Sequence, residues 1–265
     1  MVEKAPFRKP AQWPEDFHLA YILPVHNEAA TLEKTLLFMR DQLGAYKKFS
    51  LLLIENGSQD NSFSICQKLV NSDSPEVLAF QEINAGIGYA FFRGIKEAIN
   101  LWEKHYSDKK NFWILLNAAD LPFGFTDLGS FLDYGGVDRG RHQIFIGSKG
   151  HKYSRVDTSI LRKTLSLGYR AIRRFLLGMQ TKDSQGSVFI HIDLAKKLIN
   201  KIQSRNFFFT TELICLSEKN GQVPAELPVT VYKGIRKSTV KPFKDSRRMF
   251  IQTMKLAKRL REKSI

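Results

Sequence analysis

The feature that most constrains this chain is an alternation of apolar runs with amphipathic stretches between Phe17 and about Asp120. Short apolar runs rich in branched and aromatic residues are typical of buried strands, and the stretches between them have helical spacing. Because parallel strands need a crossover connection, this order predicts an α/β fold with a doubly wound, mostly parallel sheet. The predicted strands are His18–Val25, Phe49–Ile54, Val77–Gln81 and Phe112–Leu116.

A polar cluster follows each of these four strands. In open parallel sheets, ligands bind beyond the carboxyl ends of the strands. We therefore expect the four clusters to line one crevice: His26-Asn27-Glu28, Glu55-Asn56-Gly57-Ser58, Asn84 to Gly88, and Asp120.

Three of the clusters have two interpretations each. Glu28 can bind ligand or stabilise the start of a helix, where carboxylates complement free backbone donors. Gly86 and Gly88 can bring backbone amides close to a phosphate, or let a helix pack closely. Asp120 can hold a divalent cation against a diphosphate, since hard cations bind oxygen ligands, or cap the next helix.

The second half is less regular and strongly basic. A short strand over Ile144–Gly147 leads into a basic loop from Ser148 to Lys152. A predicted helix over Ser159–Leu177 carries several arginines, which serve function or form a solvated face. Residues Lys244–Lys263 form a second basic amphipathic helix, which either lies on a membrane surface or docks on its own domain.

Charge and apolar patterning restrict the partners and the compartment. The net charge of +15 favours anionic partners such as phosphorylated substrates or an anionic membrane surface, and nucleic-acid-binding motifs are missing. No apolar run reaches the roughly 18 residues of a membrane span, and the first residues do not resemble a signal peptide. With only two cysteines as well, we expect a cytoplasmic protein, peripheral to the inner membrane face if the C-terminal helix binds lipid.

Short motifs over nearly the whole chain resemble the family-2 glycosyltransferases, and in particular their polyprenyl- and dolichyl-phosphate mannosyl- and glucosyltransferase branch. Their order and spacing match, although each motif is short. They are Pro24-Val25-His26-Asn27-Glu28, Glu55 to Asp60, Asn84 to Ala90 with Gly94, Ala118-Ala119-Asp120-Leu121, Ile146 to Lys149, Asp183 to Gly186, Glu212-Leu213, Glu226 to Val229, and Lys237-Ser238.

The resemblance implies a GT-A fold, a nucleotide-diphosphate sugar donor, Mg²⁺ or Mn²⁺ held at Asp120, and inversion at the anomeric carbon. It also implies an N-terminal extension over 1–16, a glycosyltransferase domain over 17–243 with donor and acceptor halves that meet at 121/122, and the basic helix over 244–265. The implied donor-binding residues are Pro24, His26, Glu28, Glu55, Asn56, Gly86, Gly88, Ala118 and Ala119. The implied acceptor-binding residues are Ser148, Lys149, His151, Lys152, Arg155, Lys237 and Ser238.

Three departures from the family pattern fall in the donor site. Asn56 replaces the aspartate that typically accepts the N–H of uracil, so its carboxamide can accept that bond or donate to another base edge. Ile87 replaces a lysine near the phosphates. Ala118 replaces the first aspartate of the Asp-x-Asp motif, while Asp120 keeps the second. These changes are compatible with a shifted donor, weaker metal dependence or lost catalysis.

The predicted reaction transfers a sugar to a polyprenyl phosphate or another precursor of a cell-surface glycan. A hydroxyl acceptor needs a general base, for which Asp183 and Glu212 are the candidates by position, whereas a phosphate acceptor is already anionic. A non-catalytic family member that binds nucleotide or an anionic glycan as a partner subunit is the main alternative. A nucleotidyltransferase fits less well, because the glycine-rich basic loop after the first strand is missing.

Overall fold

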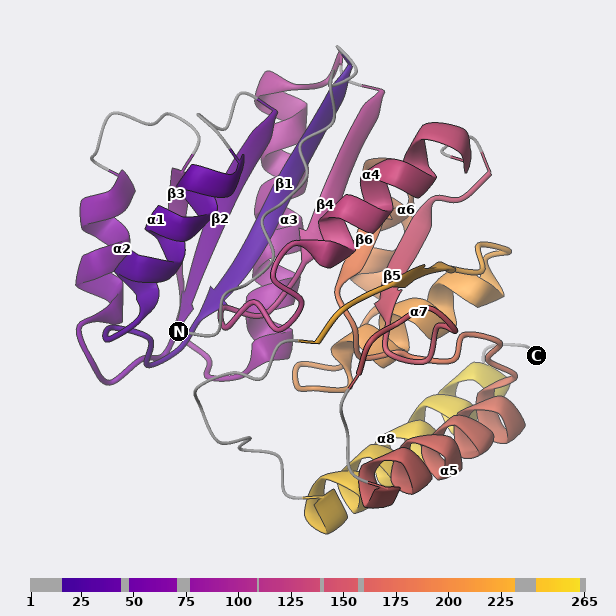
Figure 1. The fold of residues 1–265 in the computed structure, drawn as a ribbon. Helices are drawn as coiled ribbons and strands as arrows, with labels where there is room; N and C mark the ends of the chain where they lie inside the picture. Colours follow the sequence, from indigo (N-terminus) through magenta and orange to yellow (C-terminus); the bar gives the residue numbers. More distant parts are fainter. Residues whose placement is uncertain are drawn as a thin grey trace.

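The computed structural model describes residues 16–43, 48–70, 77–108, 110–138, 141–156, 160–231 and 242–262. Strands and helices alternate through its first half, as the sequence pattern predicts (Figure 1). The elements are β1 (Phe17–Val25), α1 (Leu32–Leu43), β2 (Phe49–Asn56), α2 (Ser62–Val70), β3 (Val77–Glu82), α3 (Ile87–His105), β4 (Asn111–Leu116), α4 (Thr126–Asp138), β5 (Ile144–Ser148), α5 (Ile160–Leu177), β6 (Val188–His191), α6 (Ile192–Leu198), the 3₁₀ turn η1 (Ile199–Lys201), α7 (Phe209–Lys219), β7 (Ala225–Pro228) and α8 (Pro242–Glu262).

The strands form one mixed sheet in the order β3-β2-β1-β4-β6-β5-β7. Strands β1 to β4 are mutually parallel where they pair, and β6 runs antiparallel to both of its neighbours, β4 and β5. The predicted α/β class with a mostly parallel sheet and flanking helices is therefore confirmed.

Apolar side chains cover both faces of the sheet because successive residues of a strand point to opposite sides. Ala20 and Ile22 of β1 pack in the cluster that contains α3, α6 and α7, whereas Leu19, Tyr21 and Leu23 pack with α1 and α4. Helix α3 approaches β1 closely, since a Cβ on Gly94 would lie 2.5 Å from Cγ2 of Ile22. The result is a three-layer arrangement in which the carboxyl ends of the parallel strands β1 to β4 lie at one edge of the sheet.

Several predicted boundaries differ from the observed ones. The first helix begins at Leu32 rather than Glu28, because residues 27–31 form turns in which the Glu28 carbonyl accepts the N–H groups of Thr31 and Leu32. The apolar stretch that begins at Val223 forms a strand over Ala225–Pro228, followed by a bridge between Arg155 and Thr230.

The C-terminal helix α8 lies side by side with α5, below the sheet in Figure 1. Leu256 and Ala257 of α8 belong to the core, and Thr253 is fully buried. The side of α8 that carries these three residues therefore docks on the chain's own domain, which is one of the two interpretations of this helix. Among the residues that the structure describes, no helix combines the length and apolarity needed to cross a membrane.

Candidate active site

The loops that follow β1 and β2 are joined by hydrogen bonds. His26 Nδ1 lies 2.9 Å from the Asn56 carbonyl oxygen, and Asn27 Oδ1 accepts the Gln59 N–H at 2.8 Å. The Glu28 N–H donates to Ser62 Oγ at 2.8 Å. The two polar clusters predicted to share a crevice are thus in direct contact, although Glu28 lies in the turns before α1 rather than at a helix N-terminus.

Glu55 and Asn56 are both buried at the end of β2, next to the β1 segment that contains Pro24. Glu55 accepts the Ser58 N–H at 2.6 Å, so part of its carboxylate holds the turn. No described residue donates a hydrogen bond to Asn56 Oδ1. An unsatisfied buried acceptor costs about 1–3 kcal/mol, which marks Asn56 as a position that a ligand N–H would stabilise.

The glycines at the start of α3 contact a distant loop. A Cβ on Gly88 would lie 2.3 Å from the carbonyl carbon of Arg205, and one on Gly86 would lie 3.1 Å from the Arg205 carbonyl oxygen. Gly86 also has φ +137°, a conformation that L side chains rarely adopt. Close packing therefore explains both glycines, and the surface that they pack against is the loop at residues 205–206 rather than the sheet.

The end of β4 rests on a buried polar cluster of Asn117, Tyr21 and Asp127. Asn117 Nδ2 donates to Tyr21 Oη at 2.9 Å and to Asp127 Oδ2 at 3.1 Å, while Asn117 Oδ1 accepts the Ala118 N–H at 2.8 Å. Burial raises the pKa of Asp127 to about 6 and the pKa of Tyr21 well above its usual range. This cluster fixes the backbone at the Ala118–Asp120 turn.

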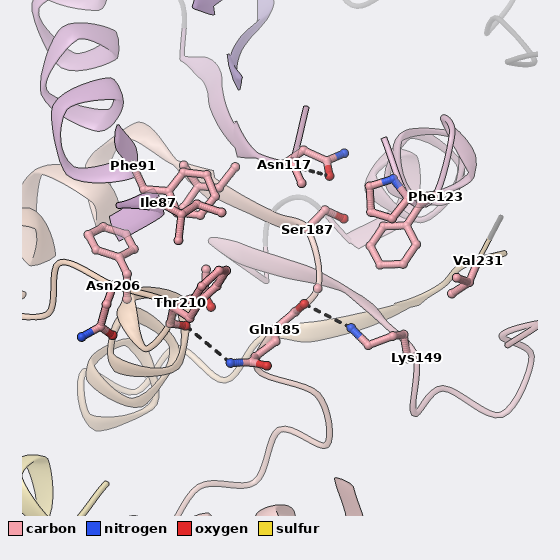
Figure 2. A pocket seen from close by; sticks show the side chains of 16 residues that line it. Ile87, Phe91, Asn117, Phe123, Lys149, Gln185, Ser187, Asn206, Thr210 and Val231 are labelled. Atoms are coloured by element: carbon pink, nitrogen blue, oxygen red, sulfur yellow. Dashed lines mark hydrogen bonds between the residues drawn. The ribbon is translucent and has the colours of Figure 1, made fainter. Parts of the chain in front are cut away.

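A cavity of about 270 Å³ opens beside this turn (Figure 2). Ala118 and Ile87 line it from the first half of the chain, and Lys149 and Gln185 line it from the second half. Aromatic residues form much of the remaining wall: Phe91, Phe123, Phe207 and Phe209. Two halves of the chain that the sequence assigns to donor and acceptor thus meet at one cavity.

Asp120 comes two residues after Ala118, which lines the cavity, but Asp120 does not line the cavity itself. Its residue is exposed, Ala119 is half-buried, and the next residue, Leu121, has φ 45°. Within the described ranges, no group of three His, Cys, Asp or Glu residues is placed to hold a metal ion. A metal at Asp120 would therefore fit only in the way that Mg²⁺ binds through one or two carboxylates together with substrate phosphates and water.

An ion pair between Lys149 and Asp183 organises the part of the site that comes from the second half of the chain. Lys149 Nζ lies 3.0 Å from Asp183 Oδ2 and donates to the Gln185 carbonyl at 3.1 Å. Burial raises the pKa of Asp183, but the Lys149 ammonium and hydrogen bonds from Gln185 and Lys149 outweigh this and lower it overall. Asp183 is therefore ionised and paired, which makes it a weak proton acceptor.

The rest of the basic loop surrounds Ser148. This buried hydroxyl donates to Glu226 at 2.9 Å, so Ser148 anchors the start of the loop to β7. His151 is half-buried, and burial lowers its pKa. Lys152 and Arg155 are exposed, and the Arg155 backbone joins the Val229–Val231 segment. Lys237 and Ser238 lie outside the described residues.

Glu212 lies away from the cavity, although the sequence offers it as a catalytic base. Its carboxylate accepts the Gln203 N–H at 2.9 Å and the Ser204 N–H at 2.8 Å, and it pairs with Arg259 of α8. Burial alone would raise the pKa of Glu212, but the hydrogen bonds from Ser204 and Arg259 lower it. These contacts describe a structural carboxylate that joins α7, the preceding loop and α8.

One arginine of the basic helix α5 also has a structural role. Arg173 is buried and donates to the carbonyl groups of Thr181 at 3.3 Å and Lys182 at 2.8 Å. It thereby holds the segment that leads to Asp183. Arg174 is exposed and Arg170 half-buried, so the solvated-face interpretation suits Arg174.

The fold agrees with comparisons to known proteins. The family model described as glycosyl transferase family 2 matches residues 21–191, which is more than half of the 265 residues. The chain therefore belongs to glycosyl transferase family 2, a family of transferases with the GT-A fold. Its membership confirms the family resemblance, whereas the polyprenyl-phosphate branch stays a prediction.

Solved structures of glucosyl-3-phosphoglycerate synthase from Mycobacterium tuberculosis are similar to this chain. One contains Mn²⁺, uridine-diphosphate-glucose and phosphoglyceric acid, with 14% identity over 95% of this chain and 86% of that chain and a TM-score of 0.63. Another contains Mg²⁺ and uridine-diphosphate, with 14% identity over 91% of this chain and 79% of that chain and a TM-score of 0.62. At these identities the similarity shows the shared GT-A fold.

Proposed function

We propose that this protein is an inverting glycosyltransferase that moves a sugar from a nucleotide-diphosphate donor to a phosphorylated polyprenyl lipid or another cell-surface glycan precursor. The observation that carries the proposal is the cavity in which Ala118 and Ile87 from the donor half face Lys149 and Gln185 from the acceptor half. In the similar synthase structures, a uridine-diphosphate sugar and a phosphorylated acceptor are bound together.

The carboxylates near the cavity favour a phosphate acceptor over a hydroxyl. A general base works best with a pKa near the working pH, whereas the pKa of Asp183 is lowered beside Lys149. Glu212, the other candidate, pairs with Arg259 outside the cavity. A phosphate oxygen is already anionic, needs no base, and would bind the Lys149 ammonium, while the aromatic wall suits the apolar start of a lipid tail.

In the proposed reaction, the acceptor oxygen attacks the anomeric carbon in line with the departing nucleotide diphosphate. A new carbon–oxygen bond forms as the bond to the diphosphate breaks, and the electron pair leaves with the diphosphate. A divalent cation held by Asp120 would offset the charge of that leaving group. The chain's own contribution is positioning: the Asn117 cluster fixes the turn at Ala118, and the Lys149 loop holds the acceptor.

We propose that Asn56 reads the nucleotide base. Its buried Oδ1 receives no hydrogen bond from the described residues, and a base N–H would satisfy it. Uracil and guanine present an N–H at the position where cytosine and adenine present an acceptor, so an acceptor at Asn56 would select the first pair. With cytosine or adenine, Asn56 Oδ1 would face another acceptor and stay unsatisfied. This costs about 1–3 kcal/mol, which corresponds to roughly 5- to 150-fold in affinity.

We also propose that the α5–α8 face rests on an anionic membrane at the cytoplasmic side. Large apolar residues are exposed on both helices: Leu167, Phe175, Phe250, Ile251 and Met254. Exposed basic residues such as Arg174, Arg247 and Arg248 lie on the same two helices. Apolar and basic side chains together are the composition of a surface that binds anionic lipid, and such a surface would bring the cavity to a lipid acceptor.

A panel of nucleotide sugars tests the proposal. The wild-type chain should release nucleoside diphosphate from one donor in the presence of Mg²⁺ or Mn²⁺ and polyprenyl phosphate, and Asp120→Asn should reduce this release by at least tenfold. Asp133→Asn, a change of an exposed aspartate on α4, is the matched control. Unchanged turnover in Asp120→Asn would refute the role of Asp120.

The non-catalytic alternative keeps support from Ala118 and Ile87, which replace an aspartate and a lysine of the family pattern. Such a protein would bind nucleotides weakly or without metal and would give no turnover with any donor. Calorimetric titration with several nucleotides, with and without Mn²⁺, alongside the turnover panel separates the two functions.

A further inference from the structure

A second cavity, of about 440 Å³, lies between α8 and the loop that precedes α7. It shares one lining residue, Asn206, with the cavity of the candidate active site, but nothing in the proposed transfer uses it. Its wall combines cations with carboxamides and a hydroxyl. The polar lining residues are Gln203, Ser204, Arg205, Asn206, Glu212, Gln252, Lys255 and Arg259.

The cavity has an excess of positive charge. Three of the lining side chains are cations, Arg205, Lys255 and Arg259, against the single carboxylate of Glu212. That carboxylate already accepts two backbone N–H groups and the Arg259 guanidinium. Its charge is therefore largely offset, and the local field favours an anion.

Donor groups remain available to such an anion. Arg259 pairs with Glu212 through Nη2. Arg205 donates to the Ile202 and Ser204 carbonyls through Nη1, and its guanidinium stacks on the Phe92 ring at 3.7 Å. A guanidinium carries five N–H donors in a fork that matches phosphate oxygens. The exposed Lys255 adds a mobile ammonium at the rim.

We propose that this cavity is a binding site for a phosphate group, distinct from the donor site. The ligand class is a phosphomonoester or phosphodiester, supplied by a soluble phosphorylated metabolite or by a lipid headgroup. The site lies one loop away from the donor crevice, because Arg205 and Asn206 line the cavity and also form the backbone against which Gly88 packs. The proposal stands apart from the transfer reaction and does not require it.

The test compares two charge reversals on α8 in the full chain without donor. Lys255→Glu changes the cavity rim, whereas Lys258→Glu changes a side chain that is 80% exposed and does not line the cavity. Inorganic phosphate and glycerol 3-phosphate are titrated calorimetrically, and flotation is measured with neutral phosphatidylcholine vesicles and with vesicles that contain phosphatidylglycerol. Lys255→Arg, which keeps the charge, is the rescue variant.

We expect the wild type, Lys258→Glu and Lys255→Arg to bind a phosphate ligand alike, and Lys255→Glu to bind it at least tenfold more weakly. A loss confined to the soluble ligands identifies a metabolite site, and a loss confined to the anionic vesicles identifies a lipid headgroup. Equal affinities of Lys255→Glu and Lys258→Glu, or no binding by the wild type, would overturn the proposal. Because turnover is not the readout, an inactive enzyme would leave this result unaffected.

Discussion

The Lys149 ammonium lies 3.0 Å from Asp183 Oδ2, and the backbone N–H of Lys149 donates to the same oxygen at 3.0 Å. This double contact joins the loop after β5 to the turn before β6 at the mouth of the active-site cavity. It also places the cation that would hold an acceptor phosphate next to a carboxylate that cannot easily take up a proton.

Removing the cation should weaken acceptor binding. We expect Lys149→Met to raise the KM for the phosphorylated acceptor by at least tenfold, since a charged hydrogen bond contributes about 1.5–3 kcal/mol, while donor affinity changes little. Steady-state kinetics with each substrate varied in turn measures this. Lys152, which the family resemblance also implies in acceptor binding, does not line the cavity. Lys152→Met should therefore leave both KM values nearly unchanged; equal effects of the two variants would contradict the role of Lys149.

The same substitution should change the acid stability. A carboxyl group whose folded-state pKa is lowered, as for Asp183, contributes stability above its unfolded pKa and loses it as the pH falls through the folded value. Without Lys149 the folded pKa of Asp183 should move up toward its unfolded value, so the variant should lose less stability than the wild type as the pH falls below the unfolded pKa. Urea unfolding between pH 3 and pH 7 provides the comparison.

Asp127 should have the opposite pH dependence. Burial raises its pKa to about 6, so the folded state holds the proton more tightly, and stability should fall as the pH rises from about 4 to about 6. The difference from the ordinary value of 3.8 corresponds to a loss on the order of 3 kcal/mol. Asp127→Asn should lack this decline in urea unfolding, and a parallel decline in both proteins would argue against it.

Gly88 and Gly168 should respond differently to alanine. A Cβ on Gly88 would lie 2.3 Å from the Arg205 backbone, whereas a Cβ on Gly168 in α5 would meet nothing within 4 Å. We expect Gly88→Ala to lower the free energy of unfolding by about 1–3 kcal/mol through overpacking. Gly168→Ala should raise it by about 0.5–1 kcal/mol through helix propensity. In thermal melts, the melting temperature should therefore fall for Gly88→Ala and rise for Gly168→Ala relative to the wild type.

The sequence predicted the parallel core of the fold well because buried strands such as Phe49–Ile54 are continuous apolar runs with few other interpretations. It placed helix α1 too early, because Glu28 has the composition of a helix start while Asn27 adopts φ 54° and begins a set of turns. It also predicted that the loops after β1 and β2 meet, since parallel strands end at one edge.

The sequence could not reveal which polar residues satisfy one another across long separations. Glu212 resembles a catalytic carboxylate until its partner Arg259 is known, and that partner lies on the last helix. Asn117 was overlooked as a positioning residue because its partners, Tyr21 and Asp127, come from β1 and α4. A lone asparagine after the apolar run Phe112–Leu116 was the available signal, since a polar side chain there needs buried partners.

The most direct test of the proposed function compares a polyprenyl phosphate with the matching polyprenol as acceptor, using a labelled sugar on the donor that the panel identifies. We expect labelled lipid only from the phosphate, with little formed by Lys149→Met and nearly normal amounts by Lys152→Met. Equal transfer to the alcohol would contradict the account, because that reaction needs a general base that neither Asp183 nor Glu212 is placed to provide.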